Sequence, residues 1–336
     1  MSAVTSDSYD VICLGEVLVE VATTAPFGHD VPAVLGISGD TLNVAAAAAA
    51  AGARVGLGAV LTDDDLGRAI AARVEALGIG TGLLRFAAGQ QGVYLVHSDP
   101  AGEREFSYAR SGSVGSSLSP EHLPDGVLRA AGAVVASGIA GAISPSALDA
   151  VRHAARVAER FVYDPNYRPR LTTSDEAAAI LAELAPDAWL ITPSYPGETT
   201  VLLAADSAVD AAQRLRTLGT EIVAVTCGAS GVQVVDAEVS AWIPSVPAPA
   251  VVDQTGAGDA YVGTLTARLV LGDDLVTAAR LAAAASSLVV GGRGGTGLVP
   301  TLAQTRAHLS TAEPDSACVA APAKSTQAPA REGTGA

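Results

Sequence analysis

Cysteine and histidine are scarce in this chain of 336 residues, which has three cysteines and five histidines. The cysteines at 13, 227 and 318 are too few and too far apart for a disulfide framework or a CxxC metal motif. The histidines show no HExxH spacing, so the sequence predicts no structural zinc site. This composition is typical of a protein in a reducing, cytoplasmic compartment.

Basic residues are also few, because 20 Lys and Arg stand against 35 Asp and Glu, which gives a net charge of −15. Binding to nucleic acid or to anionic membranes needs clustered Lys and Arg, so this balance argues against both kinds of partner. Residues 1–10 include two acids and no Lys or Arg, unlike a signal or transit peptide. The most apolar stretches, 41–53 and 281–292, are shorter than the ~20 residues of a membrane span.

Apolar residues, in contrast, make up 49% of the chain, and their pattern predicts alternating strands and helices. We expect strands at 11–14, 55–61, 133–137, 161–164, 189–192 and 221–226, and a hairpin over 232–243. Helices are expected at 45–51, 62–77 (with Thr62 as the N-cap), 145–160, 174–184 and 207–218, with two more between 256 and 290. This alternation predicts an α/β fold with a mostly parallel sheet and helices on both faces.

One segment breaks the alternation. Residues 93–97 and 105–110 flank a turn at 98–102, with no helix between them. We expect a small β-sheet lid whose strands lie within about 16–38 and 92–111. The main domain is expected over residues 10–310, and the Ala-, Pro-, Ser- and Thr-rich tail, 311–336, is expected to be disordered.

The most informative stretch for chemistry is 251–261, where an extended apolar run passes two glycines, Gly256 and Gly258, and enters an apolar helix. Unpaired N–H groups at such a helix N-terminus suit phosphate oxygens. Asp259 would repel phosphate there unless it accepts a proton from an attacking hydroxyl, although it could equally be a helix-capping acid. The stretch is no GxGxxG fingerprint, because Tyr261 occupies the third glycine position, and no GxxxxGK[ST] motif occurs in the chain.

Residues 253–259, DQTGAGD, resemble the C-terminal signature of the ribokinase (PfkB) family of carbohydrate kinases, DTxGAGD. Residues 39–45 resemble the N-terminal signature of that family, GGxxxNxA, although Ser38 replaces its first glycine. Further matches, in family order between about residues 10 and 305, are 15–16, 52–56, 164–169 and 225–231. The resemblance implies a ribokinase-like three-layer sandwich with a β-sheet lid and ATP-dependent phosphorylation of a sugar.

By this resemblance, Asp259 is the catalytic base, and Gly256, Ala257 and Gly258 form the anion hole for the transferring phosphoryl group. It also implies Mg²⁺, organised through water by Glu198, and a nucleotide lying along Thr226, Gly228, Gly231, Gly256 and Gly258. Asp253 stands where the family often builds a monovalent-cation site, such as one for K⁺. Gly228 and Gly231 could also be a simple hairpin turn.

Two features depart from the family pattern. In the Asn-x-x-Glu motif, Tyr195 replaces the asparagine, so only Glu198 is carried over. The adenine-side asparagine is replaced by small residues within 281–287. These departures leave open a binding module that has lost catalysis, whereas the intact GAGD favours a kinase. A nicotinamide-dependent oxidoreductase would need a glycine fingerprint after the first strand, where the chain reads Gly15-Glu-Val-Leu.

The sugar site is expected at strand ends and in the lid, from Gly39, Asp40, Asn43, Tyr94, Tyr108, Arg110 and Arg168. Tyr108 and Arg110 are two residues apart and are expected on one face of a lid strand. Two arginines suit a carboxylate better than a neutral polyol, because the guanidinium fork pairs with a carboxylate bidentately. These features look most like the 2-keto-3-deoxygluconate kinases of the family. Fructokinases share a similar lid and remain the alternative, a nucleoside kinase fits less well, and a homodimer through the lid is expected.

Overall fold

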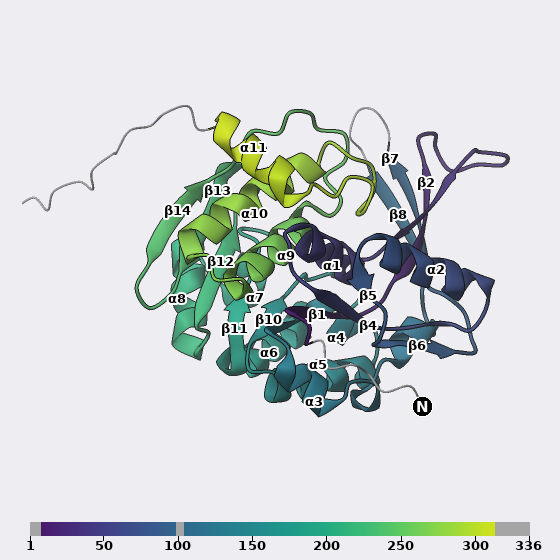
Figure 1. Ribbon diagram of the computed structural model, residues 1–336, viewed down its shortest axis with the longest axis horizontal. Helices are drawn as coiled ribbons and strands as arrows, with labels where there is room; N and C mark the ends of the chain where they lie inside the picture. Colours follow the sequence, from purple (N-terminus) through teal and green to yellow (C-terminus); the bar gives the residue numbers. More distant parts are fainter. Residues whose placement is uncertain (1–7, 99–103, 313–336) are drawn as a thin grey trace, which may run out of the picture.

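The computed structural model describes residues 8–98 and 104–312, and within them ten strands form one central sheet (Figure 1). The spatial order is β14 (Ser240–Pro244), β13 (Gly231–Val235), β12 (Ile222–Thr226), β11 (Ala188–Ile191), β10 (Phe161–Asp164), β9 (Ala133–Ser137), β1 (Val11–Leu14), β4 (Val55–Thr62) and β5 (Ile79–Gly80), with β6 (Leu84–Ala87) also paired to β4. In the described part of this sheet, β13 pairs in the antiparallel sense with both β12 and β14, and the other strand pairs are parallel. The prediction of a mostly parallel sheet is confirmed.

Helices cover both faces of this sheet, because successive side chains of each strand point to opposite sides. In β1, Val11 and Cys13 join one core and Ile12 and Leu14 join the other. The first core is covered by α1 (Asp40–Ala50), α2 (Asp65–Ala76), α9 (Ala257–Val270) and α10 (Leu275–Val289). The second core is covered by α3 (Asp125–Ala130), α4 (Gly138–Ala142), α5 (Pro145–Val157), α6 (Ser174–Leu184), α7 (Thr199–Leu203) and α8 (Ala208–Leu218).

A separate four-stranded sheet forms the lid, which projects from one end of the molecule beside α2 (Figure 1). Its order is β3 (Val34–Ser38), β2 (Leu18–Thr23), β7 (Val93–Ser98) and β8 (Arg104–Ala109). Four short 3₁₀ helices lie in loops: η1 (Val114–Ser117), η2 (Pro120–His122), η3 (Ala185–Asp187) and η4 (Gly228–Ser230). The prediction of a separate small sheet is confirmed, whereas most of the predicted turn, 99–102, lies outside the described residues.

Small residues allow α1 and α9 to pack very closely. A β-carbon at Gly263 of α9 would lie 2.2 Å from the carbonyl oxygen of Val44 in α1. The alanine run of α1 is buried against the same neighbour. This close crossing brings the N-terminal turns of the two helices together, and the candidate site lies there.

Several predicted boundaries are corrected. The N-cap of α2 is Asp64, whose Oδ1 accepts the N–H of Gly67 at 2.9 Å, and Thr62 instead donates to Asp64 at 2.7 Å. The helix predicted over 145–160 ends at Val157.

The sequence interpretation also omitted α11 (Leu302–Ala312), which packs against α10. Thr301 and Gln304 bond reciprocally at its start, a capping-box signal that was available in the sequence. This helix passes the expected domain end at 310 by two residues, and 313–336 lie outside the described residues. No helix in the described ranges is long and apolar enough to cross a membrane.

Candidate active site

The N-terminus of α9 presents a glycine turn. Gly256 is the N-cap, with φ of 82°, and no side chain caps the helix. A β-carbon at Gly256 would lie 3.0 Å from the carbonyl oxygen of Gly295, so glycine serves both the left-handed conformation and the close approach. Gly258, in the first turn, is exposed. The turn therefore offers backbone N–H groups and the positive end of a helix dipole to an anion.

The carboxylate of Asp259, in the first turn of α9, meets the side chain of Asn43 in α1. Asn43 Nδ2 donates a hydrogen bond to Asp259 Oδ2 at 2.8 Å. Burial among protein atoms and the negative charge of Asp40 raise the pKa of Asp259 to about 7, whereas Asn43 and the Arg168 guanidinium act in the opposite direction. The side chain keeps partial access to solvent. An acid with this pKa can accept a proton near neutral pH.

Three of the predicted sugar residues, Gly39, Asp40 and Asn43, come together at the start of α1. Gly39 is the N-cap, with φ of 128°, and a β-carbon there would lie 2.8 Å from the carbonyl oxygen of Glu16. The Asp40 carboxylate accepts a hydrogen bond from Ser137 Oγ. Asp40 also lines a hollow at the carboxyl ends of β1, β9 and β10, where open α/β sheets bind ligands.

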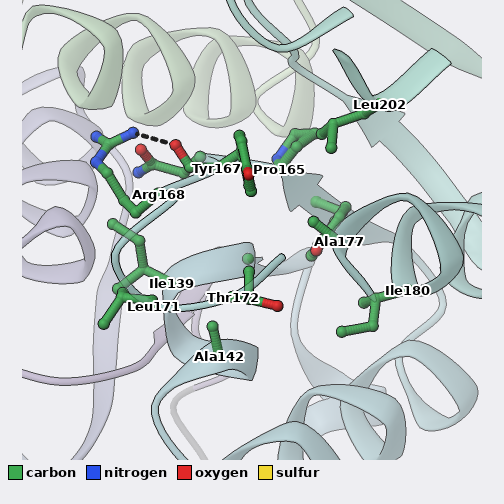
Figure 2. Close-up of a pocket in the computed structure, with 13 residues that line it drawn as sticks. Ile139, Ala142, Pro165, Tyr167, Arg168, Leu171, Thr172, Ala177, Ile180 and Leu202 are labelled. Carbon is green, nitrogen blue, oxygen red and sulfur yellow. Dashed lines mark hydrogen bonds between the residues drawn. The ribbon is translucent and has the colours of Figure 1, made fainter. Parts of the chain in front are cut away.

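Arg168 follows β10, and its guanidinium is exposed at the rim of a second pocket (Figure 2). Its Nη1 donates to the carbonyl oxygen of Tyr167 at 3.1 Å. Behind it, Ile139, Leu171 and Ile180 are among the apolar side chains that surround the pocket, which has room for about one water molecule (about 10 Å³). The lining of this pocket is mostly apolar, and the hollow beside Asp40 is equally small.

Asp164, at the end of β10, is a site residue that the sequence interpretation did not single out. It is buried, and this burial, together with the carboxylates of Glu198 and Asp259, raises its pKa well above the usual range. The negative charge of Asp40 acts in the same direction, whereas Arg168 opposes it. The available signal was its place at the end of a central strand, within the family-like stretch 164–169.

The two lid tyrosines lie opposite each other on β7 and β8. Tyr94 is paired in register with Tyr108, and their ring centroids are 5.9 Å apart. Tyr94 is buried and its hydroxyl donates to the Glu20 carboxylate, whereas Tyr108 is 45% exposed. Both rings therefore lie on one face of the lid sheet, where Tyr94 is covered and Tyr108 is partly open to solvent.

Arg110 lies beyond the end of β8, which stops at Ala109. Its side chain is only 11% exposed, and its Nη2 lies 2.5 Å from Glu16 Oε2. Burial raises the pKa of Glu16, whereas Arg110 and the Ser113 hydroxyl favour the charged form. The expectation that one strand face presents both Tyr108 and Arg110 is corrected, because Arg110 has left the strand and packs against a buried carboxylate.

The predicted nucleotide residues follow β12. Thr226 ends this strand, and its hydroxyl donates to the carbonyl oxygen of Pro193 at 3.4 Å. Gly228, with φ of 54°, borders open space, since an added β-carbon would meet nothing within 4 Å. At Gly231, a β-carbon would lie 2.3 Å from the carbonyl oxygen of Ile243. The hairpin itself therefore requires Gly231.

The oxygens of Glu198 are both engaged by backbone groups. Oε1 accepts the N–H of Tyr167 at 2.6 Å, and Oε2 accepts the N–H of Ser194 at 2.7 Å. Among the described residues, no three His, Cys, Asp or Glu side chains lie close enough to hold a metal ion by themselves. The backbone of the loops that follow β10 and β11 therefore fixes the orientation of the Glu198 carboxylate.

Asp253 connects the turn before α9 to the loop at 291–297. Its Oδ1 accepts from the N–H and the hydroxyl of Thr255, at 2.9 and 2.8 Å, and its Oδ2 accepts from the N–H of Gly294 at 2.9 Å. It is buried. Asp253 therefore holds together the two loops that border the glycine turn.

Comparisons with known proteins agree with this arrangement. Residues 10–302 match the pfkB family of carbohydrate kinases. The chain is 33% identical over 297 residues to 2-dehydro-3-deoxygluconokinase of Thermoproteus tenax, covering 86% of this chain and 91% of that protein. It is 31% identical over 270 residues to fructokinase-1 of Oryza sativa subsp. japonica, covering 77% and 83%.

Among solved structures, an Escherichia coli protein assigned as a ribokinase II, in complex with ATP and Mg²⁺, matches with a TM-score of 0.82. The match covers 90% of this chain and 99% of that one at 23% identity, so it supports the fold alone. With the family match spanning nearly all of the described residues, the chain belongs to the pfkB family of carbohydrate kinases.

Proposed function

We propose that this sugar kinase transfers the γ-phosphoryl group of ATP to a hydroxyl of 2-keto-3-deoxygluconate, a small sugar acid. One observation carries the proposal: the Asp259 carboxylate, with a pKa of about 7, lies in the first turn of a helix whose amides no side chain caps. A proton acceptor and an anion site within one helical turn meet the needs of alcohol phosphorylation, which depends on positioning and charge stabilisation.

Asp259 takes the proton of the attacking hydroxyl. Asn43 donates to its Oδ2, which leaves Oδ1 to face the sugar. Burial, together with the negative charge of Asp40, keeps the proton affinity of Asp259 high enough for this step. General bases contribute about 10²–10⁴-fold to turnover.

The backbone of Gly256, Ala257 and Gly258 holds the transferring phosphoryl group. The N–H of Ala257 makes a long hydrogen bond of 3.3 Å to Gln254, which a phosphoryl oxygen can replace. Thr226 and Gly228 border the path of the nucleotide. The GAGD turn and the Asn43 contact support catalysis over a binding module that has lost it.

ATP would bind together with Mg²⁺, as in the E. coli relative of this fold. The ion supplies neutralisation of the phosphate charge. Glu198 would hold the Mg²⁺ ion through water. The carboxylates of Glu198 and Asp164 repel each other, and a cation beside them would relieve this repulsion. Asp253 would border a monovalent-cation site. A comparison of turnover in K⁺ and in Na⁺ tests this assignment.

Specificity for an acid comes from Arg168 and Arg110. Arg168 is exposed at the rim of the pocket behind β10 and is within electrostatic reach of Asp259. Arg110 keeps a buried Nε–H without an acceptor among the described residues. The T. tenax relative supports the sugar acid by its name, whereas the rice relative supports a neutral ketohexose, which remains the second candidate.

The experiment is an ADP-release screen of keto-deoxy acids, ketohexoses, pentoses and nucleosides with ATP and Mg²⁺. Arg168→Ala should raise the KM of the sugar acid by about 10²-fold, because a charge-assisted pair contributes about 1.5–3 kcal/mol. A neutral ketose should lose far less. Arg156→Ala, an exposed arginine on α5, is the matched control. Equal losses on both sugars would contradict the carboxylate assignment.

We also infer a homodimer through the lid. The edge strand β3 exposes Val34 and Leu35, at 71% and 68%, beside unpaired backbone groups. Exposed apolar edge strands pair readily with a second chain. The lid of a second copy of this chain is therefore a suitable partner for the exposed edge of β3.

A further inference from the structure

Ser38 ends lid strand β3 and is buried where the lid meets the body of the protein, with 3% of its surface exposed. Its Oγ donates to Oδ1 of Asn43 at 3.3 Å. Ser38 stands where the family signature has a glycine. A chain that follows the signature has no hydroxyl here, so this hydrogen bond is a feature of the present sequence.

The Ser38 hydroxyl decides which end of the Asn43 amide faces Asp259. A carboxamide has one acceptor end and one donor end, and an oxygen placed against the carboxylate would be repelled. With Oδ1 engaged by Ser38, Nδ2 is the end that donates to Asp259 at 2.8 Å. The amide is also confined on one side, since a β-carbon at Gly295 would lie 2.3 Å from both of its polar atoms.

Ser38 also adjoins a buried pair in the lid. The Tyr94 hydroxyl donates to Glu20, and both side chains are at most 9% exposed. Burial and the Glu20 carboxylate raise the pKa of Tyr94 far above its usual range, whereas the Ser38 hydroxyl acts in the opposite direction. Buried polar groups thus extend continuously from the lid sheet through Ser38 and Asn43 to Asp259.

We propose that Ser38 is a positioning residue for the catalytic base, which fixes the Asn43 amide so that a hydrogen-bond donor stays on the ionised carboxylate of Asp259. This proposal rests on the proposed role of Asp259 as the base. Loss of the hydroxyl leaves Oδ1 of Asn43 unpaired and allows the amide to turn. The ionised form of Asp259 is then less favoured, and a higher pH is needed to produce the active base.

Other charges act on Asp259 and have to stay constant in a test. They are Asp40 at the start of α1, Asp164 at the end of β10 and Arg168 in the loop that follows, together with the dipole of α9. Substitution of Ser38 removes none of them. A change in the pH dependence of turnover therefore reports the Asn43 hydrogen bond.

The experiment compares the wild type with Ser38→Ala and Ser38→Thr, in kcat and sugar KM from pH 5.5 to 9.5 at saturating MgATP. For Ser38→Ala we expect the acid limb of the pH profile of kcat to move to higher pH by about half to one pH unit, since the hydrogen bond from Asn43 to the ionised carboxylate is weakened but not removed. Turnover at pH 6.5 should fall about 3- to 10-fold. Turnover at pH 9 should stay within about twofold, and the KM within about threefold. Ser38→Thr keeps a hydroxyl and should restore the wild-type limb.

The outcomes are distinct. A uniform loss of kcat at all pH values, or an unmoved acid limb, would overturn the role of Ser38. Ser38→Gly removes the same hydroxyl and gives a second chance to measure the limb if the alanine variant melts early. Absence of sugar phosphorylation by the wild type would instead contradict the proposed function.

Discussion

Replacement of Asp259 by asparagine should abolish most activity and at the same time stabilise the fold. The amide cannot accept the hydroxyl proton, so kcat should fall by at least about 10²-fold while the KM of the sugar changes little. Asn43 can still donate to the oxygen of an amide at residue 259, which keeps the local geometry.

The stabilisation follows from the raised pKa. Asp259 has a pKa of about 7 in the folded protein against an ordinary 3.8, so the folded state binds the proton more tightly than the unfolded state. Ionisation of Asp259 therefore lowers the stability of the wild type progressively as pH rises from about 4 to 7. The full difference corresponds to about 4 kcal/mol above pH 7. Since the carboxylate keeps partial access to water, we expect about 1–2 kcal/mol, which is a Tm difference of a few degrees.

The assay pairs steady-state ADP release with thermal unfolding at pH 5 and pH 8. Asp259→Asn should melt a few degrees above the wild type at pH 8 and by a clearly smaller margin at pH 5, where only part of the ionisation penalty is present. Asp187→Asn, an exposed acid in η3, is the control for the change of charge. Wild-type turnover in Asp259→Asn would remove the residue from the mechanism, and an equal gain in Tm at both pH values would refute the electrostatic reasoning.

Three further experiments test the surroundings of the site and the edge of the lid. Glu16→Leu leaves Arg110 as an uncompensated buried cation and should lower the free energy of unfolding by about 3–5 kcal/mol. Glu16→Gln can still accept a hydrogen bond from the guanidinium, so it should lower the free energy of unfolding less. Denaturant unfolding measures both variants. Gly263→Ala should lower the free energy of unfolding by about 1–3 kcal/mol and should also lower kcat, because its β-carbon would lie 2.2 Å from the backbone of α1. Gly126→Ala is the control: its β-carbon would meet nothing within 4 Å, so it should change neither quantity. Leu35→Lys should yield monomers in sedimentation at micromolar concentration, and a monomeric wild type would contradict the lid dimer.

Local patterns predicted the scaffold well. The alternating strands and helices, the glycine turn before α9 and the alanine-rich α1 all depend on neighbours in sequence, and each is present. The bounds of α1 are corrected, because this helix begins at Asp40 and not at the predicted residue 45. The cap of α2 was assigned to Thr62 although Asp64 performs it, because both residues can cap and the sequence does not show where the strand ends. α11 was omitted, since its low apolar content gives little periodicity to detect.

The side-chain pairs of the site could not be predicted in this way. Asn43 and Asp259 are 216 residues apart in the sequence and meet only because Gly263 permits a close helix crossing. Glu16 was noted only as part of a family-like dipeptide, and its bond to Arg110 requires the lid to fold back on the first strand. The alternation of side chains along a strand predicted that Arg110 shares a face with Tyr108. This prediction was wrong because the strand ends one residue earlier, at Ala109.

The two arginines of the proposed carboxylate site are therefore not equivalent. Glu16 lies against Arg110 and offsets its positive charge, so Arg110 can add hydrogen-bond donors in a fixed direction but little net charge. Arg168 is exposed and counters the negative charges of Asp164 and Asp259. The chain has a net charge of −15, and Asp40 and Asp164 line the hollow at the carboxyl ends of β1, β9 and β10, so attraction of an acid substrate has to come mainly from Arg168. Discrimination between an acid and a neutral sugar should thus reside in a residue that follows a central strand, whereas the lid contributes shape and orientation.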